Sequence, residues 1–280
     1  MAGIDLIDDF RVGTKPALAI ERYGAMARHY DASCRRIEPL RALAIQSLAL
    51  RPGERVLDVA CGTGSTVLTL AQQVGPTGHV LGIEQSPEMA DIARQRLHDA
   101  GIVHAEIVTA DMQEVSRQFD ADAVLCSFTH DVLQSPAAIA RIRQLSKPGA
   151  RLAVLGARTV PWWWGWPVNL FVMWRARRYL TTFHGLGDPC ALLRPHCATL
   201  ELKGAWHAGT SYLAVGRFDG FYAFDNNVWD VAGGVVLVRE AGGHLTAPDG
   251  SAYDPFSPVA LASNGPLHPA LIASMREGPS

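Results

Sequence analysis

The stretch Arg55-Val56-Leu57-Asp58-Val59-Ala60-Cys61-Gly62-Thr63-Gly64-Ser65 decides the fold. An apolar run ends here in a glycine-rich turn, and a helical pattern begins at once. This order is typical of a parallel α/β sheet with room for a nucleotide-like ligand, because glycine lacks a Cβ and lets the backbone turn sharply beside a ligand. No Lys-Ser/Thr pair follows, which excludes a phosphate-binding loop, and Val67 stands where a full G-x-G-x-x-G motif needs its third glycine.

Length and composition indicate one large globular domain, or an ordinary domain with a small appendage. The chain has 280 residues, of which 48% are hydrophobic and 19% charged. A net charge of −2 gives no sign of bulk nucleic-acid binding. The five cysteines are widely spaced and lack the pattern of a zinc site, so we expect reduced thiols. The acidic opening differs from a secretory signal, and these features together predict a cytoplasmic protein.

Apolar segments alternate with helical patterns along the first two thirds of the chain. Strands are predicted at 56–59, 79–84, 103–109, 123–128 and 151–155, and two more at 198–206 and 210–217. A helix is predicted at 66–74, and Ser86-Pro87 and Ser135-Pro136 each start another as N-cap and first-turn proline. The alternation predicts an α/β fold.

Several of these phrases resemble one enzyme family. Leu57-Asp58-x-x-Cys61-Gly62-x-Gly64 resembles motif I of the class I S-adenosylmethionine-dependent methyltransferases. The run from Tyr23 to Asp31 resembles the entry helix of the ubiquinone and menaquinone methyltransferases, and the Lys147-Pro148-Gly149 turn before an apolar strand is a hallmark of the family. The resemblance covers about residues 20–217. It implies a Rossmann-like seven-stranded sheet with helices on both faces, and S-adenosylmethionine as cofactor.

A cofactor site can be placed on this pattern. Glu84 lies 20 residues after Gly64, the offset at which a carboxylate accepts hydrogen bonds from a ribose diol. The resemblance implies that Asp58 supports the glycine loop and the methionine amino group, and that Asp111 meets adenine. Asp58 as a cap of loop amides and Asp111 as a helix cap are the alternatives. The full set implied for the cofactor is Tyr30, Asp58, Ala60, Gly62, Gly64, Glu84, Gln85, Asp111, Met112 and Ser127.

Two aromatic residues and one histidine leave alternatives open. Tyr23 and Tyr30 close the site over the cofactor in the family's pattern, or simply pack their helix down. His130 follows the fourth strand, where cofactor and acceptor meet in the family. It is the candidate general base because its pKa suits neutral pH. It is equally placed to pack over the cofactor or to cap the next element, and many methyl transfers need no strong base.

An aromatic insert at 157–197 follows the fifth strand. It contains Pro161-Trp162-Trp163-Trp164-Gly165-Trp166-Pro167 and a helix predicted from Asn169 to Thr182, and five of the seven tryptophans fall between 162 and 174. Three interpretations remain. The insert is a lid over a flat or hydrophobic acceptor, an interfacial helix with arginines on lipid phosphates, or a packing surface.

The last part of the chain resembles a different family. The run from Trp229 to Gly243 resembles the carboxyl-terminal signature of the inositol monophosphatases, and the resemblance extends over about 209–280. It implies Asp230 as a metal ligand, but the acidic pair and the Asp-Pro-x-Asp-Gly-Thr loop of that family are missing. We therefore predict no metal site, with Asp230 as a helix cap.

The domain prediction is a methyltransferase domain at 1–217 and a small α/β appendage at 218–280 without an active site of its own. The leading hypothesis for function is methyl transfer from S-adenosylmethionine to a small, hydrophobic or aromatic acceptor. The alternatives are a magnesium-dependent sugar or inositol phosphate phosphatase, and a non-catalytic cofactor- or lipid-binding protein. Membrane or homo-oligomer contact is predicted through 161–183 or the tail.

Overall fold

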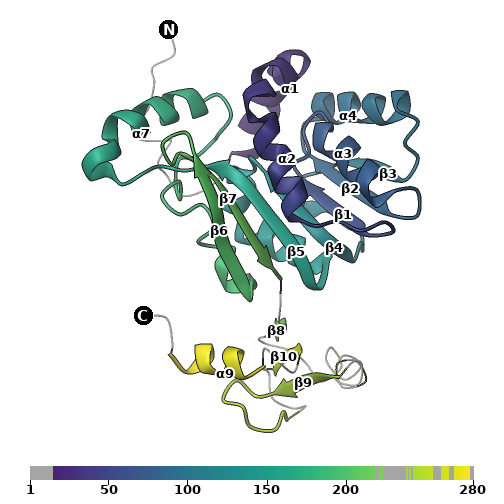
Figure 1. The fold of residues 1–280 in the computed structure, drawn as a ribbon, viewed down its shortest axis with the longest axis vertical. Coiled ribbons are helices and arrows are strands. Elements are labelled where there is room, and N and C mark those ends of the chain that lie inside the picture. Colours follow the sequence, from purple (N-terminus) through teal and green to yellow (C-terminus); the bar gives the residue numbers. More distant parts are fainter. Residues whose placement is uncertain are drawn as a thin grey trace.

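The computed structural model describes residues 15–218, 221–223, 238, 240, 242–254, 260–264 and 268–277. Seven strands form one sheet in the order β3-β2-β1-β4-β5-β7-β6, and three short strands form a second sheet in the order β8-β10-β9 (Figure 1). The large sheet consists of β1 Arg55–Val59, β2 His79–Glu84, β3 Ala105–Thr109, β4 Ala121–Ser127, β5 Ser146–Ala157, β6 Thr199–Trp206 and β7 Ser211–Arg217.

The first five strands are parallel, and the last two form an antiparallel hairpin whose second strand, β7, pairs with β5. β1 lies between β2 and β4 and is buried from Val56 to Val59, which explains the apolar residues of this strand. From β1 the chain builds the sheet outward to β2 and β3, and then returns to add β4 on the other side of β1. In open α/β sheets, ligands bind at the carboxyl ends of the strands at such a point.

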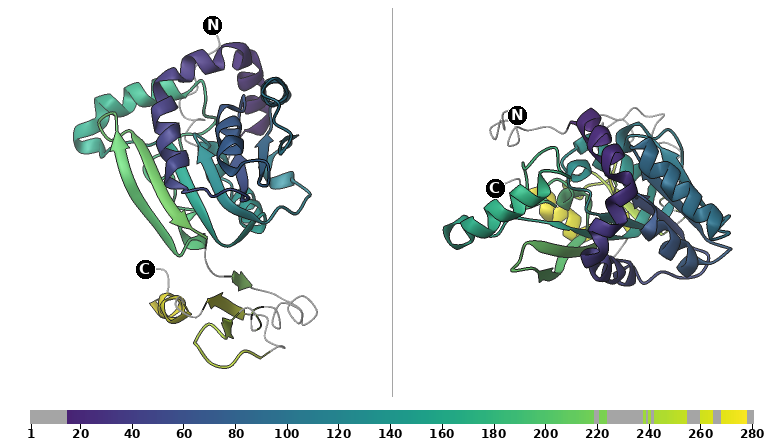
Figure 2. Two further views of the ribbon diagram at one scale, coloured as in Figure 1. Left: turned by 45° about the vertical axis from the view of Figure 1, so that its right-hand side comes forward. Right: turned by 90° about the horizontal axis from the view of Figure 1, so that it is seen from above.

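Helices cover both faces of the sheet (Figure 2). One core packs α2 Glu38–Ser47, α3 Ser65–Val74 and α4 Pro87–Asp99 against the sheet, and the other packs η3 Met112–Glu114 and α6 Pro136–Gln144. Ser86 and Ser135 accept hydrogen bonds from backbone N–H groups, as predicted for N-caps. The predicted seven-stranded Rossmann-like fold is confirmed. The remaining helices before the tail are α1 Pro16–Cys34, η2 Arg35–Ile37, α5 His130–Leu133, α7 Trp162–Ala176 and η4 Arg194–His196.

Several strand boundaries differ from the prediction, most of all at the start of β5. β3 begins at Ala105, and Val103, which is 91% exposed, lies in the loop before it. β5 begins at Ser146, so Lys147-Pro148-Gly149 lies within the strand rather than before it. Gly149 has φ +75°, and the pairing with β4 shifts register between Ala121 and Ala123. The predicted turn at Lys147-Pro148-Gly149 is therefore present as an irregularity at the start of β5.

The helix of the insert also differs. It spans Trp162–Ala176 instead of 169–182, and Pro167 lies inside it. The side chain of Asn169 is fully buried and exchanges two hydrogen bonds with the backbone of Val160, at 2.9 and 2.8 Å. This internal anchor fixes the beginning of the helix. None of the described helices is long and apolar enough to cross a bilayer.

The chain leaves the large sheet at the end of β7, on the edge opposite to the glycine loop, because β7 runs antiparallel to β5. The second sheet consists of β8 Phe221–Ala223, β9 Gly243–Thr246 and β10 Ala260–Asn264, and α9 His268–Glu277 follows. Asp230 and most of the phosphatase-like signature lie outside the described residues. The five cysteine thiols are free.

Candidate functional site

The glycine loop after β1 requires three left-handed backbone positions. Ala60, Gly62 and Gly64 have φ of +50°, +59° and +77°. A Cβ on Gly64 would lie 2.8 Å from the Cβ of Ala93, so α4 can approach the loop only because glycine stands there. The loop thereby directs the first turn of α3 toward the carboxyl edge of the sheet.

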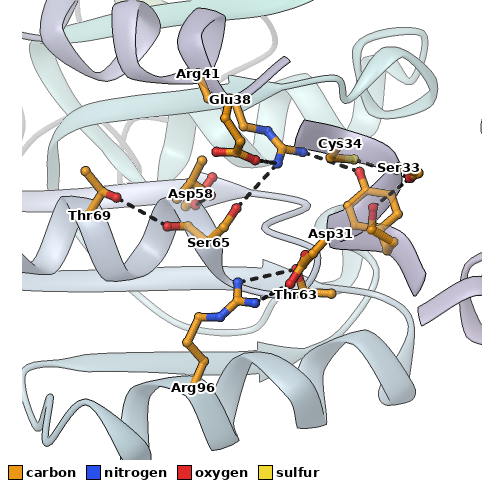
Figure 3. A network of polar contacts seen from close by, with 12 residues as sticks. Asp31, Ser33, Cys34, Glu38, Arg41, Asp58, Thr63, Ser65, Thr69 and Arg96 are labelled. Atoms are coloured by element: carbon orange, nitrogen blue, oxygen red, sulfur yellow. Dashed lines mark hydrogen bonds and ion pairs between the residues drawn. The ribbon is translucent and has the colours of Figure 1, made fainter. Parts of the chain in front are cut away.

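Helix α1 is fastened to this loop near its carboxyl end. The hydroxyl of Thr63 donates to Asp31 Oδ1 at 2.5 Å, and Arg96 of α4 forms an ion pair with the same carboxylate (Figure 3). The ring of Tyr30, one residue earlier, lies 3.7 Å from the place where a Cβ of Gly62 would be. The contact places Tyr30 over the loop, as the resemblance to the entry helix implies.

Three cavities adjoin one another at this edge. The inner cavity, of about 10 Å³, lies beside Asp58 and the loop, and the middle cavity, of about 50 Å³, lies beside Glu84. The large cavity has a volume of about 310 Å³. Tyr30 lines all three, and Ala60, Gly62 and Ser127 line both the inner and the middle cavity. The three cavities therefore share walls and lie side by side at this edge of the sheet.

Asp58 is a buried carboxylate at the end of β1 that is only half satisfied. Its Oδ2 accepts a hydrogen bond of 2.5 Å from the Thr66 hydroxyl, whereas Oδ1 has no partner among the described residues. Burial raises the pKa of Asp58 to about 7, and the Thr66 hydrogen bond and the Arg41 charge oppose that rise. The free oxygen of Asp58 therefore fits a cationic donor in the inner cavity.

Arg41 of α2 lines the same cavity and is buried. Its Nη1 donates to Glu38 at 2.6 Å and to Ser65 at 3.4 Å, and its Nη2 donates to the Tyr30 hydroxyl at 3.5 Å. Its Nε–H has no partner in the described part of the chain. Figure 3 shows Arg41 and Arg96 approaching the loop from opposite sides. The inner cavity thus offers a cation and an anion together.

Glu84 ends β2 and lines the middle cavity with Gln85. Its Oε2 accepts the Gly62 N–H at 2.9 Å, and its Oε1 accepts the Ser86 N–H at 2.8 Å. Burial raises the pKa of Glu84, and these backbone donors oppose the rise. The Gln85 N–H is a third backbone donor to this carboxylate, so Glu84 braces the loop and keeps acceptor capacity for a ribose hydroxyl.

Asp111 and Met112 lie away from these cavities. The Asp111 carboxylate caps η3 by accepting from the Gln113 N–H at 3.1 Å and from the Gln113 side chain at 3.2 Å. Met112 is buried in the core beneath α6. The capping alternative describes Asp111 as the structure shows it, and its contact with adenine stays a prediction.

His130 begins α5 and lines both the middle and the large cavity. Its Nε2 lies 2.9 Å from the carbonyl oxygen of His184, and because a carbonyl only accepts, Nε2 carries the proton. Nδ1 is then an unprotonated buried nitrogen, with no hydrogen-bond partner among the described residues. Burial lowers the pKa of His130, against the opposing charge of Asp131. This histidine is neutral and has a free lone pair at the junction of two cavities.

The large cavity is mainly apolar and is built by elements distant in sequence. Its lining residues come from α1, the ends of β4 and β5, α7 with the turns after it, and the β6–β7 hairpin. Its aromatic walls are Tyr23, Tyr30, Phe128, Phe171, Tyr179 and Tyr212. The volume and the lining are those of a site for a small molecule with aromatic or aliphatic surface.

Sequence reasoning missed two contributors to the site. Arg41 stands among the buried positions Leu40, Ala44 and Ile45 of α2, and a charge within an apolar helix face was a usable signal. Asp131 holds the insert: its Oδ2 accepts the Thr181 N–H at 2.9 Å and the Thr181 hydroxyl at 2.6 Å. No local pattern indicates the contact between Asp131 and Thr181, because the two residues lie fifty positions apart in the sequence.

Comparisons with known proteins match two families. Residues 56–149 match the model of a methyltransferase domain, and residues 190–280 match that of the inositol monophosphatase family. The second match includes β6 and β7, so it begins earlier than the predicted 209. The last hairpin of the methyltransferase-type sheet therefore belongs to the phosphatase-like match.

Curated relatives share the methyltransferase part. The ubiquinone/menaquinone biosynthesis C-methyltransferase of Burkholderia cenocepacia is 36% identical over 121 residues, which are 41% of this chain and 48% of that protein. The 2-phytyl-1,4-naphtoquinone methyltransferase of Trichormus variabilis is 32% identical over 119 residues, 41% of this chain and 52% of that protein. The chain thus spans about half the length of these two relatives.

Solved structures show the same fold at low identity. A putative O-methyltransferase of Nostoc punctiforme aligns with a TM-score of 0.54 at 17% identity, over 70% of this chain and 60% of that one. A Bacillus subtilis protein, YcgJ, aligns with a TM-score of 0.51 at 14% identity, over 80% and 93% of the two chains. Motifs, sheet order and these matches agree that the chain resembles the class I S-adenosylmethionine-dependent methyltransferases in its first part and the inositol monophosphatase family in its last.

Proposed function

We propose that the protein is an S-adenosylmethionine-dependent methyltransferase. The observation that carries the proposal is the inner cavity, which Asp58 and Arg41 both line, each with one buried polar atom that has no partner among the described residues. An α-amino acid is a zwitterion, so its ammonium suits the carboxylate and its carboxylate suits the guanidinium. The methionine end of the cofactor has these two groups, and Glu84 stands one cavity further for the ribose diol.

S-adenosylmethionine supplies a methyl group on a positively charged sulfur, which is already a reactive electrophile. The residues of this chain would hold the cofactor and the acceptor in position. Tyr30 covers the glycine loop from α1, and the loop and Ser127 separate the inner cavity from the middle one. An acceptor held in the large cavity faces the same junction, where orientation and proximity supply much of the rate enhancement.

His130 is proposed as the group that takes a proton from the acceptor. Its free Nδ1 lies at the junction between the middle and large cavities, and its neutral state at pH 7 leaves the lone pair available. Nε2 stays protonated against the His184 carbonyl and fixes the ring. A hydroxyl or an acidic carbon on the acceptor would give up its proton here as the new bond to the methyl group forms.

The acceptor is proposed to be a small hydrophobic or aromatic molecule. Six aromatic side chains line the large cavity, and its charged and imidazole groups are Arg175, His130 and His207. The curated relatives that act on quinone-type rings support this class, although they share only the cofactor-binding half. Among the described residues, no group of three His, Cys, Asp or Glu side chains is placed to hold a metal ion.

Calorimetric titration with S-adenosylmethionine and S-adenosylhomocysteine tests the proposal. We expect micromolar to sub-millimolar dissociation constants, which Glu84→Ala weakens at least tenfold and Glu84→Gln weakens less, because Gln keeps one acceptor oxygen. Glu201→Ala, at an exposed position on β6, is the matched control. Transfer of labelled methyl to a panel of phenols and hydroquinones then tests the acceptor class. Unchanged affinity in both Glu84 variants would reject the proposed site.

A further inference from the structure

Helix α7 presents a continuous apolar face to solvent. Trp163, Trp166, Leu170 and Trp174 follow at spacings of three and four residues, which places them on one stripe. All four are exposed, and Trp163 is 86% exposed. The buried residues of the helix are Gly165, Asn169 and Met173. In the three views α7 runs along the outside of the molecule, near the β6–β7 hairpin (Figures 1 and 2).

The exposed apolar surface of α7 extends beyond this stripe. Trp162, Trp164 and Phe171 are also exposed beside the stripe. Soluble monomers rarely leave contiguous apolar patches of this kind uncovered, so the patch marks an interaction surface. At 15 residues the helix is too short to span a bilayer, whereas a helix with an exposed aromatic face can lie in its interface.

Charge identifies the partner. Arg175, Arg177 and Arg178 are exposed at the end of α7 and form no ion pair with any described residue. The sequence from 132 to 187 contains eight Lys and Arg residues and no Asp or Glu, so no acid lies on α7 to repel an anionic surface. Tryptophans with adjacent arginines suit the depth of lipid headgroups. There the apolar part of an indole ring contacts acyl chains while its N–H reaches water, and the arginine cations contact lipid phosphates.

We propose that α7 binds the protein to the surface of an anionic membrane. The aromatic face, defined as Trp163, Trp166, Leu170 and Trp174, inserts at headgroup level, and the arginines contact lipid phosphates. The same helix lines the large cavity through Phe171, Val172, Arg175 and Ala176. If the proposed function holds, a hydrophobic acceptor passes from the lipid into that cavity along the helix.

Vesicle flotation with the full chain tests the interface. We expect binding to phosphatidylcholine vesicles that contain phosphatidylglycerol, weaker binding to phosphatidylcholine alone, and a blue shift of tryptophan emission on binding. The variant Trp163→Ser/Trp166→Ser/Trp174→Ser should abolish binding to both. Arg177→Gln/Arg178→Gln should weaken binding to the anionic vesicles about 30-fold, which corresponds to about 1 kcal/mol per arginine, and should change binding to phosphatidylcholine little.

The matched control is Val103→Ser/Leu202→Ser, which removes exposed apolar side chains elsewhere on the surface and should bind as the parent does. Circular dichroism and titration with S-adenosylhomocysteine show whether each variant is folded. Equal vesicle binding by the parent and the tryptophan variant would overturn the proposal. So would absence of vesicle binding together with a dimer, seen by sedimentation, that the tryptophan variant loses. Vesicle binding without cofactor binding would reject the proposed function and leave the interface in place.

Discussion

Arg41 and Asp58 line one small cavity with opposite charges, and each has a buried polar atom without a hydrogen-bond partner among the described residues. Unpaired buried polar atoms are costly, because the group loses water and gains nothing in return. A ligand that carries a cation and an anion close together would satisfy both groups at once.

Asp58→Asn should weaken binding of S-adenosylmethionine by about 10- to 100-fold. The substitution keeps the shape and removes the negative charge, and a hydrogen bond to a charged group contributes about 1.5–3 kcal/mol. Calorimetric titration measures the change. Asp91→Asn, which removes an exposed charge on α4, should leave affinity unchanged and serves as control. Equal affinities for Asp58→Asn and the parent would contradict the assignment of the ammonium to Asp58.

Affinity for the cofactor should rise by about tenfold between pH 6 and pH 8. The pKa of Asp58 is raised to about 7, so its carboxylate ionises across this range and becomes attractive to an ammonium. The same dissociation constants measured for Asp58→Asn should be nearly flat over the range. A parental profile as flat as that of the variant would show that Asp58 ionises well outside it.

The unliganded protein should lose stability through Asp58 as the pH rises from about 4 to about 7. Because the folded pKa lies above the unfolded value, the folded state holds the proton longer, so its advantage is full at low pH and is lost through this window. The difference in pKa corresponds to at most about 4 kcal/mol. Urea unfolding at pH 5 and pH 8 should show a smaller loss in Asp58→Asn. A loss of the same size in both proteins would argue against a buried, titrating Asp58.

His130→Gln should lower the rate of methyl transfer about 10²- to 10⁴-fold at saturating cofactor and leave binding of S-adenosylhomocysteine within twofold. Glutamine can still donate an amide N–H toward the His184 carbonyl, so the fold is kept while the basic nitrogen is lost. His104→Gln, remote from the cavities, is the control. Because the pKa of His130 is lowered, its contribution should persist from pH 8 to pH 7 and fall only on further acidification. A variant with full activity would show that no base is needed.

Much of this architecture could be predicted from the sequence. The strands, the glycine loop and the position of Glu84 at the end of β2 follow from local patterns, and the structure has all three, whereas the contact of Glu84 with a ribose stays a prediction. The bounds of α7 could not be predicted, because Pro167 suggests a helix boundary and only the buried Asn169 shows that the helix continues through it. The hydrogen bonds between Asp131 and Thr181 could not be predicted either, because they join segments that are distant in the sequence.

The β6–β7 hairpin has a consequence for how such a joined chain avoids aggregation. Without it, β5 would be the exposed edge of the sheet, and the backbone N–H and C=O groups on one side of this largely apolar strand would be unpaired from Arg151 to Ala157. β7 pairs with that whole row, and β6 then presents a new edge with the charged side chains Glu201 and Lys203. Backbone pairing requires only alternation and length, so a hairpin from a chain of other ancestry can close the sheet. Edge protection, together with the packing of Tyr212, Leu213 and Ala214 into the two cores, then joins the part that resembles the phosphatases to the rest of the sheet.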